Sequence, residues 1–375
     1  MHVRCARIAA TILFAANGLT FATWAASIPR VAERLKLTPG SVAIAVFTVS
    51  LGSIAAMPVV GRLVDRFGAG RIALAGAALL PLLLPFVVEA TSFAQLLAGG
   101  IVFGVMLGTM EVGMNAYAVA AERAAGAAWI SQAHGVWSVG NVLGSLAIAA
   151  LIASRTPLPS LASALAVAIA VLIAARLAVP VPQREPVRGA ATPHVALVIL
   201  GIFAAAGLLV EGAMADWAAL YLRRDLGASA ALAPLGYTAF SGAMMAARFI
   251  GDATVLRFGR SFTLATSGAI SAVALAVALS VPNAFAACVA YACVGIGCAN
   301  LAPTVFGVAG RLAAGTGVAT VTGIGYAAFL VGPALIGGAA QLIGLHLALW
   351  IVVACAAGVA IAALTPRLRY ALASE

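Results

Sequence analysis

The stretch Gly61-Arg62-Leu63-Val64-Asp65-Arg66-Phe67-Gly68-Ala69-Gly70-Arg71 is a short charged turn between two apolar runs that are too long for the core of a soluble protein. Its glycines let the backbone bend sharply and let neighbouring helices approach closely. A related stretch follows about 190 residues later, where Gly251-Asp252 leads into Arg257-Phe258-Gly259-Arg260. A turn that recurs at this separation predicts a chain built from two copies of one half-unit.

The composition places the chain in a lipid bilayer. Hydrophobic residues make up 64% of the 375 residues and charged residues only 9%, which excludes an ordinary soluble domain. About 15 of the 21 Arg and Lys residues fall on the loops on the same side as Gly61–Arg71, and about six on the other side. This asymmetry predicts a multi-pass protein with both termini in the cytoplasm. Because no basic run is interleaved with aromatic residues, we expect no nucleic-acid partner.

Twelve apolar runs are long enough to cross a bilayer as helices of about 20 residues. They cover residues 7–28, 40–60, 72–89, 94–120, 130–153, 160–179, 194–221, 231–250, 262–281, 284–307, 318–342 and 347–365. The first run continues too far for a cleaved secretory signal, so we interpret it as a retained helix. A polar, proline-rich segment separates the sixth run from the seventh. The sequence therefore predicts an N-terminal six-helix bundle over 1–180, a cytoplasmic linker over 181–193 and a C-terminal six-helix bundle over 194–375.

The order of glycines and charges in Gly61–Arg71 resembles the loop between helices 2 and 3 of the major facilitator superfamily of secondary transporters. The resemblance implies an all-α membrane protein of twelve transmembrane helices in two pseudo-symmetric six-helix bundles. It also implies a gating role for the charged turn and its second copy, whose residues are Gly61, Asp65, Arg66, Gly68, Arg71, Arg248, Asp252 and Arg257. The second copy has Leu256 at the position of Asp65, so a charge latch there has to use Asp252 or Arg248. The alternative is a solvated loop that only fixes the topology.

Glu111 is the first candidate for proton coupling. It lies twelve residues before Arg123, about 18 Å inside the cytoplasmic end of its helix. Gly104, Gly108, Glu111 and Asn115 follow one helical face. A carboxylate at that depth is costly unless it serves a cavity, a partner or a proton path. The alternative is a structural Glu in a buried hydrogen-bond network.

The segment Glu111-Val112-Gly113-Met114-Asn115-Ala116-Tyr117 resembles the Glu-x-x-x-Asn-Pro-Tyr signature of the fucose permease branch of sugar/proton symporters. In that branch the glutamate is tied to sugar recognition and proton coupling, and the resemblance implies this role for Glu111. Ala116 replaces the proline of the signature. The membrane aspartate that the branch carries before Ile28-Pro29 corresponds to about Ala25 here, so the seventh helix would have to supply a second acid. Glu211 and Asp216 are the candidates, and Asp216 can instead pair with Arg223 or Arg224.

Other polar residues at membrane depth predict a cavity between the two halves that takes a small polar or planar organic substrate. They recur at helical spacing on the first, fourth, fifth, eighth, tenth and eleventh helices: Asn17, Thr20, Trp24, Asn115, Gln132, His134, Trp137, Asn141, Tyr237, Ser241, Tyr291, Asn300 and Tyr326. The alternative for each is a helix-packing residue whose polar group is satisfied locally.

The sequence contains no Gly-Lys-Ser/Thr nucleotide loop, no metal-spaced His/Cys cluster and no catalytic Ser-His-Asp set, so it predicts no enzyme, no cofactor and no metal. We expect a proton gradient as the energy source and a monomer in the bacterial inner membrane, whose partners are a small-molecule substrate and the lipid bilayer. Proton symport is the leading hypothesis. A proton-antiport exporter of hydrophobic compounds and a membrane sensor without transport are the alternatives.

Overall fold

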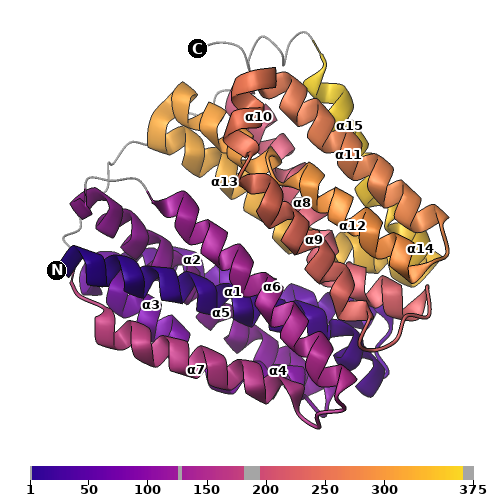
Figure 1. Ribbon diagram of the computed structural model, residues 1–375, viewed down its shortest axis with the longest axis horizontal. Coiled ribbons are helices and arrows are strands. Elements are labelled where there is room, and N and C mark those ends of the chain that lie inside the picture. The colour runs from indigo at the N-terminus through magenta and orange to yellow at the C-terminus, as the bar shows by residue number, and fades with distance from the viewer. Residues whose placement is uncertain (1, 126–128, 181–194, 366–375) are drawn as a thin grey trace. The chain divides into compact units, whose positions relative to one another are not determined.

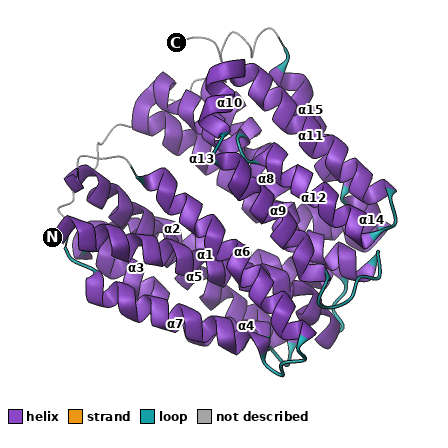
Figure 2. Cartoon of the chain, in the orientation of Figure 1, coloured by secondary structure: helices purple, strands orange, loops and turns teal. Residues whose placement is uncertain are grey.

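The computed structural model describes residues 2–125, 129–180 and 195–365, and the elements in these ranges are all helices (Figures 1 and 2). The fifteen helices within these ranges are α1 (His2–Arg34), α2 (Pro39–Phe67), α3 (Ala69–Ala78), α4 (Leu80–Val88), α5 (Phe93–Ala125), α6 (Ile130–Ala153), α7 (Pro159–Leu177), α8 (Val195–Arg224), α9 (Ala233–Arg248), α10 (Gly251–Phe258), α11 (Arg260–Ser280), α12 (Ala284–Cys298), α13 (Leu301–Ile343), α14 (Leu345–Ala348) and α15 (Trp350–Ala363).

Within the described ranges, eleven helical segments are long and apolar enough to cross a membrane. The predicted run 231–250 is not among them, because α9 has 16 residues and a crossing helix needs about 20. Leu79 separates α3 from α4, and the pair still forms a single crossing segment, Ala69–Val88. α13 runs over 43 residues, and the crossing segments Ala284–Phe306 and Gly323–Ile343 agree with the predicted runs 284–307 and 318–342.

The chain forms two compact units. Unit 1 comprises residues 1–185 with 229–238, and unit 2 comprises residues 186–228 with 239–375. The first turns of α9 therefore belong to unit 1 and the rest of α9 to unit 2. The linker predicted at 181–193 lies outside the described residues, and the domain boundaries 1–180 and 194–375 stay a prediction.

Small residues bring the helices of unit 1 into backbone contact. α1 packs along α6, where a Cβ on Gly140 would lie 2.3 Å from the carbonyl oxygen of Ala15 and one on Gly18 would lie 2.1 Å from that of Trp137. α2 packs along α5 in the same way, because a Cβ on Gly104 would lie 2.0 Å from the Val49 carbonyl oxygen. Side chains larger than hydrogen cannot fit at these crossings.

Charged and polar side chains connect the ends of α1, α4 and α7 in unit 1. The Glu89 carboxylate pairs with Arg34 at 2.8 Å and with Arg30 at 3.6 Å, and it accepts a hydrogen bond from the Ser160 hydroxyl at 2.8 Å. Arg34 also donates to the backbone carbonyl of Ala90 at 3.0 Å. This network satisfies carbonyls that the ends of helices leave without an intrahelical partner.

Unit 2 is built around the packing of α8 against α13 and of α11 against α12 and α15. Apolar side chains of α8, α11, α13 and α15 meet in one core. Its buried members include Leu200, Phe203, Leu264, Leu301 and Val359. α12 approaches α9 closely, because a Cβ on Gly295 would lie 2.1 Å from the Phe240 carbonyl oxygen. This close approach fixes the depth of α9 against α12, and both helices contribute to the candidate site of unit 2.

The charged turn is shorter than the sequence predicted. Residues Gly61–Phe67 are the last turns of α2, and Gly68 alone separates α2 from α3. Gly68 has a φ of 88° and a ψ of 140°, a region that favours glycine, and its N–H donates to the Val64 carbonyl. Gly259 separates α10 from α11 with nearly the same values, 79° and 162°. The two copies of the sequence motif therefore share their backbone geometry as well as their residue types.

Candidate substrate and proton sites

An ion pair between Glu211 and Arg248 occupies the interior of unit 2. Glu211 lies about 20 Å from the end of α8 at Arg224, and Arg248 ends α9. The Arg248 Nη2 and Glu211 Oε2 atoms are 3.7 Å apart, and 27% and 19% of the two side chains are exposed. Charges at membrane depth persist when they pair or line a water-filled path, and this pair meets the first condition.

The Arg248 guanidinium keeps an unused donor. Its Nε is buried without a hydrogen-bond partner. The Cys298 thiol of α12 lies in the neighbourhood of Glu211 and Arg248, and the Ser271 hydroxyl contacts that thiol at 3.7 Å. This thiol is a weakly polar neighbour of the pair, and such a group screens a charge less than water does.

Sequence reasoning placed Glu211 in proton coupling and Arg248 in the gating motif with Asp252, and so missed their pairing. Asp252 begins α10 as its second residue, and its side chain is outside the described set. The signal available was that Glu211 lies well inside its apolar run, where an unpaired charge is costly, and that Arg248 near the end of the run 231–250 is a base that can pair with it. Asp216, the other candidate acid of α8, is half-buried.

A hydrogen-bonded cluster in unit 1 joins the predicted stripes of two helices. Trp137 Nε1 of α6 donates to Asn17 Oδ1 of α1 at 2.8 Å. One turn further along α6, Asn141 Nδ2 donates to the Trp137 carbonyl, and Asn141 Oδ1 accepts from the Tyr237 hydroxyl at 2.8 Å. Asn17, Asn141 and Tyr237 are buried and Trp137 is half-buried. The Asn17 Nδ2 donor is buried without a partner.

The two other candidates on α1 are packed side chains. Thr20 is fully buried, and its hydroxyl donates to the Ala16 carbonyl at 2.7 Å. Trp24 is also buried and lies against Phe103, with ring centroids 6.3 Å apart. Both geometries are typical of helix packing.

The predicted face of α5 is divided between packing and polar residues. Its glycine part lies against α2, where a Cβ on Gly108 would lie 2.6 Å from the Ser53 hydroxyl oxygen. Glu111 and Asn115 are half-buried, and Asn115 Nδ2 donates to the Glu111 carbonyl at 2.8 Å. The Glu111 side chain is thus neither sealed in the core nor fully exposed.

The remaining cavity candidates are dispersed. Gln132 is exposed and accepts a hydrogen bond from Arg7 at 2.8 Å, while His134 is exposed and contacts the edge of Phe14 at 5.0 Å between ring centroids. The other four lie on unit 2 helices: Ser241 and Tyr291 are buried, and Asn300 and Tyr326 are half-buried. The Tyr291 hydroxyl is buried without a hydrogen-bond partner.

In the gating motif, Asp65, Arg66 and Arg71 are exposed, and Gly61 and Gly68 are partly exposed. The Arg66 guanidinium lies 5.2 Å from the centroid of Phe67, and Arg257 lies 5.3 Å from that of Phe258. Equivalent cation–π contacts therefore accompany both glycine turns.

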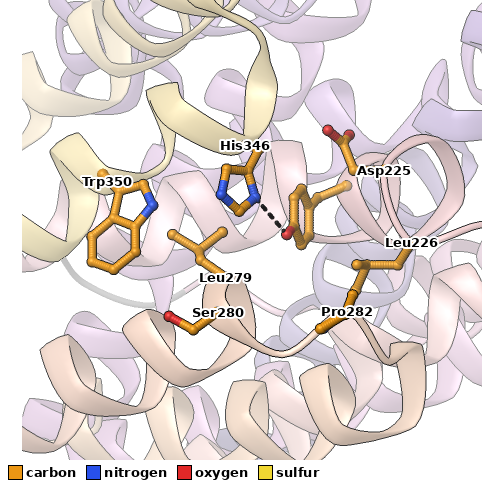
Figure 3. Close-up of a pocket in the computed structure, with 8 residues that line it drawn as sticks. Asp225, Leu226, Leu279, Ser280, Pro282, His346 and Trp350 are labelled. Atoms are coloured by element: carbon orange, nitrogen blue, oxygen red, sulfur yellow. Dashed lines mark hydrogen bonds between the residues drawn. The ribbon is translucent and has the colours of Figure 1, made fainter.

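A pocket of about 480 Å³ at the end of α8 was not predicted (Figure 3). Its polar lining comes from Asp225, Ser280, His346 and Trp350, with Tyr221 sharing a hydrogen bond with His346 Nδ1 at 3.0 Å. These residues lie in or beside the predicted loops 222–230, 282–283 and 343–346. Counting the predicted helices puts all three loops on the same side of the membrane. That shared side was the signal in the sequence that these residues could come together.

Within residues 2–125, 129–180 and 195–365, no three His, Cys, Asp or Glu side chains come close enough together to hold a metal ion. The polar groups described here can bind, orient and exchange protons, and they contain no activated nucleophile.

Comparisons with known proteins identify a transporter family. The profile of the Major Facilitator Superfamily matches residues 10–218. An uncharacterized transporter of the same family type from Yersinia pestis is 32% identical over 355 residues, covering 91% of each chain. An uncharacterized transporter of Sinorhizobium fredii is 31% identical and covers 93% of this chain and 95% of its own. The membrane protein MosC of Rhizobium meliloti is 28% identical and covers 91% of this chain and 85% of its own.

Among solved structures, the nucleoside transporter NupG carries the same fold. A point mutant of NupG matches with a TM-score of 0.76 and 12% identity, covering 97% of this chain and 99% of that chain. A second NupG structure matches with a TM-score of 0.71 and 12% identity, over 99% of this chain and 100% of that chain. At this identity the likeness concerns the fold and not the substrate.

Proposed function

Because the chain belongs to the major facilitator superfamily, a family of secondary transporters, we propose that it moves a small organic solute across the inner membrane by alternating access in symport with protons. The proposal includes twelve spans, with α9 and α10 together forming the crossing that α9 alone is too short to make, and both termini in the cytoplasm. The narrower resemblance to the fucose permease branch stays a prediction, which depends on Glu111.

The observation that carries the proposal is the Glu211–Arg248 pair. Protonation of Glu211 removes one charge of the pair, leaves Arg248 without its counter-charge and so changes the relative free energies of the states that the transporter visits. A ligand or proton shifts such an equilibrium by its differential affinity for the two states. Glu111 of α5 is a second protonation site in unit 1. The proton gradient then drives accumulation, because protons bind on one side and leave on the other.

The glycine turns contribute to switching in this proposal. Gly68 and Gly259 each separate two helices by one residue, so a small change at either turn reorients the helices that flank it. The exposed charges of Asp65 and Arg66 beside the first turn stabilise one of the two states.

The test uses purified protein in proteoliposomes. A thermal-shift screen against sugars, organic acids, nucleosides and drugs first identifies a substrate. We expect an imposed inward proton gradient to drive its accumulation by the wild type. In Glu211→Gln, accumulation should fall at least about tenfold while substrate exchange at equal concentrations continues, because exchange needs no net proton movement. Glu33→Gln, at an exposed end of α1, is the control. Full gradient-driven accumulation by Glu211→Gln would refute the coupling role, and drug efflux against the gradient would indicate the antiport alternative.

A further inference from the structure

In the Glu211–Arg248 pair, the guanidinium of Arg248 does not use all of its hydrogen-bond donors. The 3.7 Å between Nη2 and Oε2 is longer than a hydrogen bond, and Nε is buried without a partner. Nε and Nη2 form the side-on edge of the guanidinium, which matches the two oxygens of a carboxylate in a bidentate pair. Glu211 is thus close enough to balance the charge of Arg248 and too far to use the edge.

The unused polar atoms buried in unit 2 are all able to donate hydrogen bonds. Besides Arg248 Nε they include Trp217 Nε1 and the Tyr291 hydroxyl. A buried donor left without a partner is costly, and at Arg248 this favours a bound group that supplies acceptors. Carboxylates are acceptors at every lone pair, whereas alcohols and amides also bring donors.

Resting on the proposed function, we propose that the substrate is a small organic acid whose carboxylate binds the Nε/Nη2 edge of Arg248 when Glu211 is protonated. The two carboxylates compete for one cation. With Glu211 ionised, the pair has no net charge, and the Glu211 carboxylate repels an incoming anion. With Glu211 protonated, it meets an unpaired positive charge, so one proton enters with each carboxylate and the pair of charges is restored.

The surroundings are consistent with this exchange. The described titratable or charged groups around the edge are Glu211 from α8, Arg248 from α9 and the Cys298 thiol from α12. Both members of the pair are partly exposed. A neutral substrate would leave Arg248 with no counter-charge in the protonated state, which is unfavourable at membrane depth.

The experiment compares acids with their amides, which have nearly the same shape and no charge. Binding of benzoate, benzamide, propionate and propionamide to purified wild type, Glu211→Gln and Arg248→Lys is measured by titration calorimetry at about pH 5.5 and about pH 8. We expect the acids to bind at least about tenfold more tightly at the lower pH and the amides to bind weakly at both. Glu211→Gln should bind the acids tightly at both pH values. Arg248→Lys should lose about tenfold because it cannot form the bidentate pair.

The Glu211→Gln arm is a gain of affinity at the higher pH, so misfolding cannot imitate it. Equal binding of acid and amide, failure of both acids to bind, or weaker acid binding by Glu211→Gln would overturn the proposal. The flux test separates this from the proposed function. Proton-driven accumulation of a neutral solute would refute the acid assignment and leave proton symport intact. Tight, pH-dependent binding of acids without proton-driven flux would refute symport and leave the Arg248 site intact.

Discussion

At the scale of single residues, a buried amide and an indole form the central hydrogen bond between α1 and α6 in unit 1. The Asn17 amide has its oxygen occupied by Trp137 and its nitrogen unused. Such half-satisfied groups are costly in a packed interior, so they are informative about either a ligand or a mobile neighbour. The Asn17–Trp137 contact can be tested without knowing the substrate.

Trp137→Phe keeps an aromatic ring beside Phe21, whose centroid lies 6.0 Å away, and removes the donor to Asn17. We expect the unfolding free energy in detergent to fall by about 1 kcal/mol, because both ends of the buried amide then lack a partner. Adding Asn17→Leu should restore part of the loss, since removing both partners costs less than removing one. Thermal unfolding of the three variants checks this, and equal melting of Trp137→Phe and wild type would contradict it.

At the scale of helices, contact is set by the glycines at the crossings. The α1–α6 and α2–α5 seams bring backbone against backbone, and in a bilayer such packing replaces the hydrophobic effect as the attraction between helices. Glycines that face open space have no such role. The chain therefore contains glycines at which substitution should separate two helices and glycines that serve as controls for substitution.

Gly140→Ala places a methyl group 2.3 Å from the Ala15 carbonyl oxygen, so α1 and α6 must move apart. We expect a loss of about 1 to 3 kcal/mol in unfolding free energy and a lower melting temperature. Gly338→Ala, in α13 with nothing within 4 Å of its added carbon, is the matched control and should be neutral or slightly stabilising. A control that melts lower than Gly140→Ala would show that helix propensity and not crossing distance decides the effect.

The ends of α1, α4 and α7 depend on Glu89. Glu89→Gln keeps the shape and removes the charge that pairs with Arg34 at 2.8 Å and Arg30 at 3.6 Å. We expect about 1 to 3 kcal/mol of destabilisation, because two partly buried guanidinium groups lose their counter-charge. Asp65→Asn, at an exposed position near the end of α2, should melt like the wild type. Melting of Glu89→Gln at the wild-type temperature would mean that the backbone carbonyls hold the arginines alone.

At the scale of the whole molecule, orientation in the membrane follows from where the arginines lie. The asymmetry of about 15 against about six basic residues predicts that the Gly68 turn faces the cytoplasm. Ala124 lies at the end of α5, just before α6 begins, and Ser154 directly follows the end of α6. The two residues therefore lie at opposite ends of α6, and both are exposed.

Single cysteines at these two positions test the orientation after Cys5, Cys288, Cys293, Cys298 and Cys355 have been replaced. We expect a membrane-impermeant maleimide to label Ser154→Cys in intact cells and Ala124→Cys only after permeabilisation. The opposite labelling pattern would place the termini outside the cytoplasm.

The sequence by itself determined the membrane class, most of the crossing segments, the glycine turns at Gly68 and Gly259 and the positions of the acids Glu111 and Glu211. These features are local, because insertion into lipid depends on the length and polarity of each run and a turn depends on the backbone freedom of one residue. The turn predicted over residues 61–71 is reduced to Gly68 in the structure, since helix ends are decided by capping and packing.

Only the tertiary structure decided which polar residues meet. Tyr237 and Asn141 are 96 positions apart, and Tyr221 and His346 are 125 apart. Arg248, predicted as a gate residue, pairs with Glu211. Helical periodicity fixes which residues share a face of one helix, but the rotation and depth of that helix against its neighbours come from close packing at residues such as Gly140 and Gly295. Pairing of these partly buried charges depends on that packing, and so the candidate site could not be assembled from the chain alone.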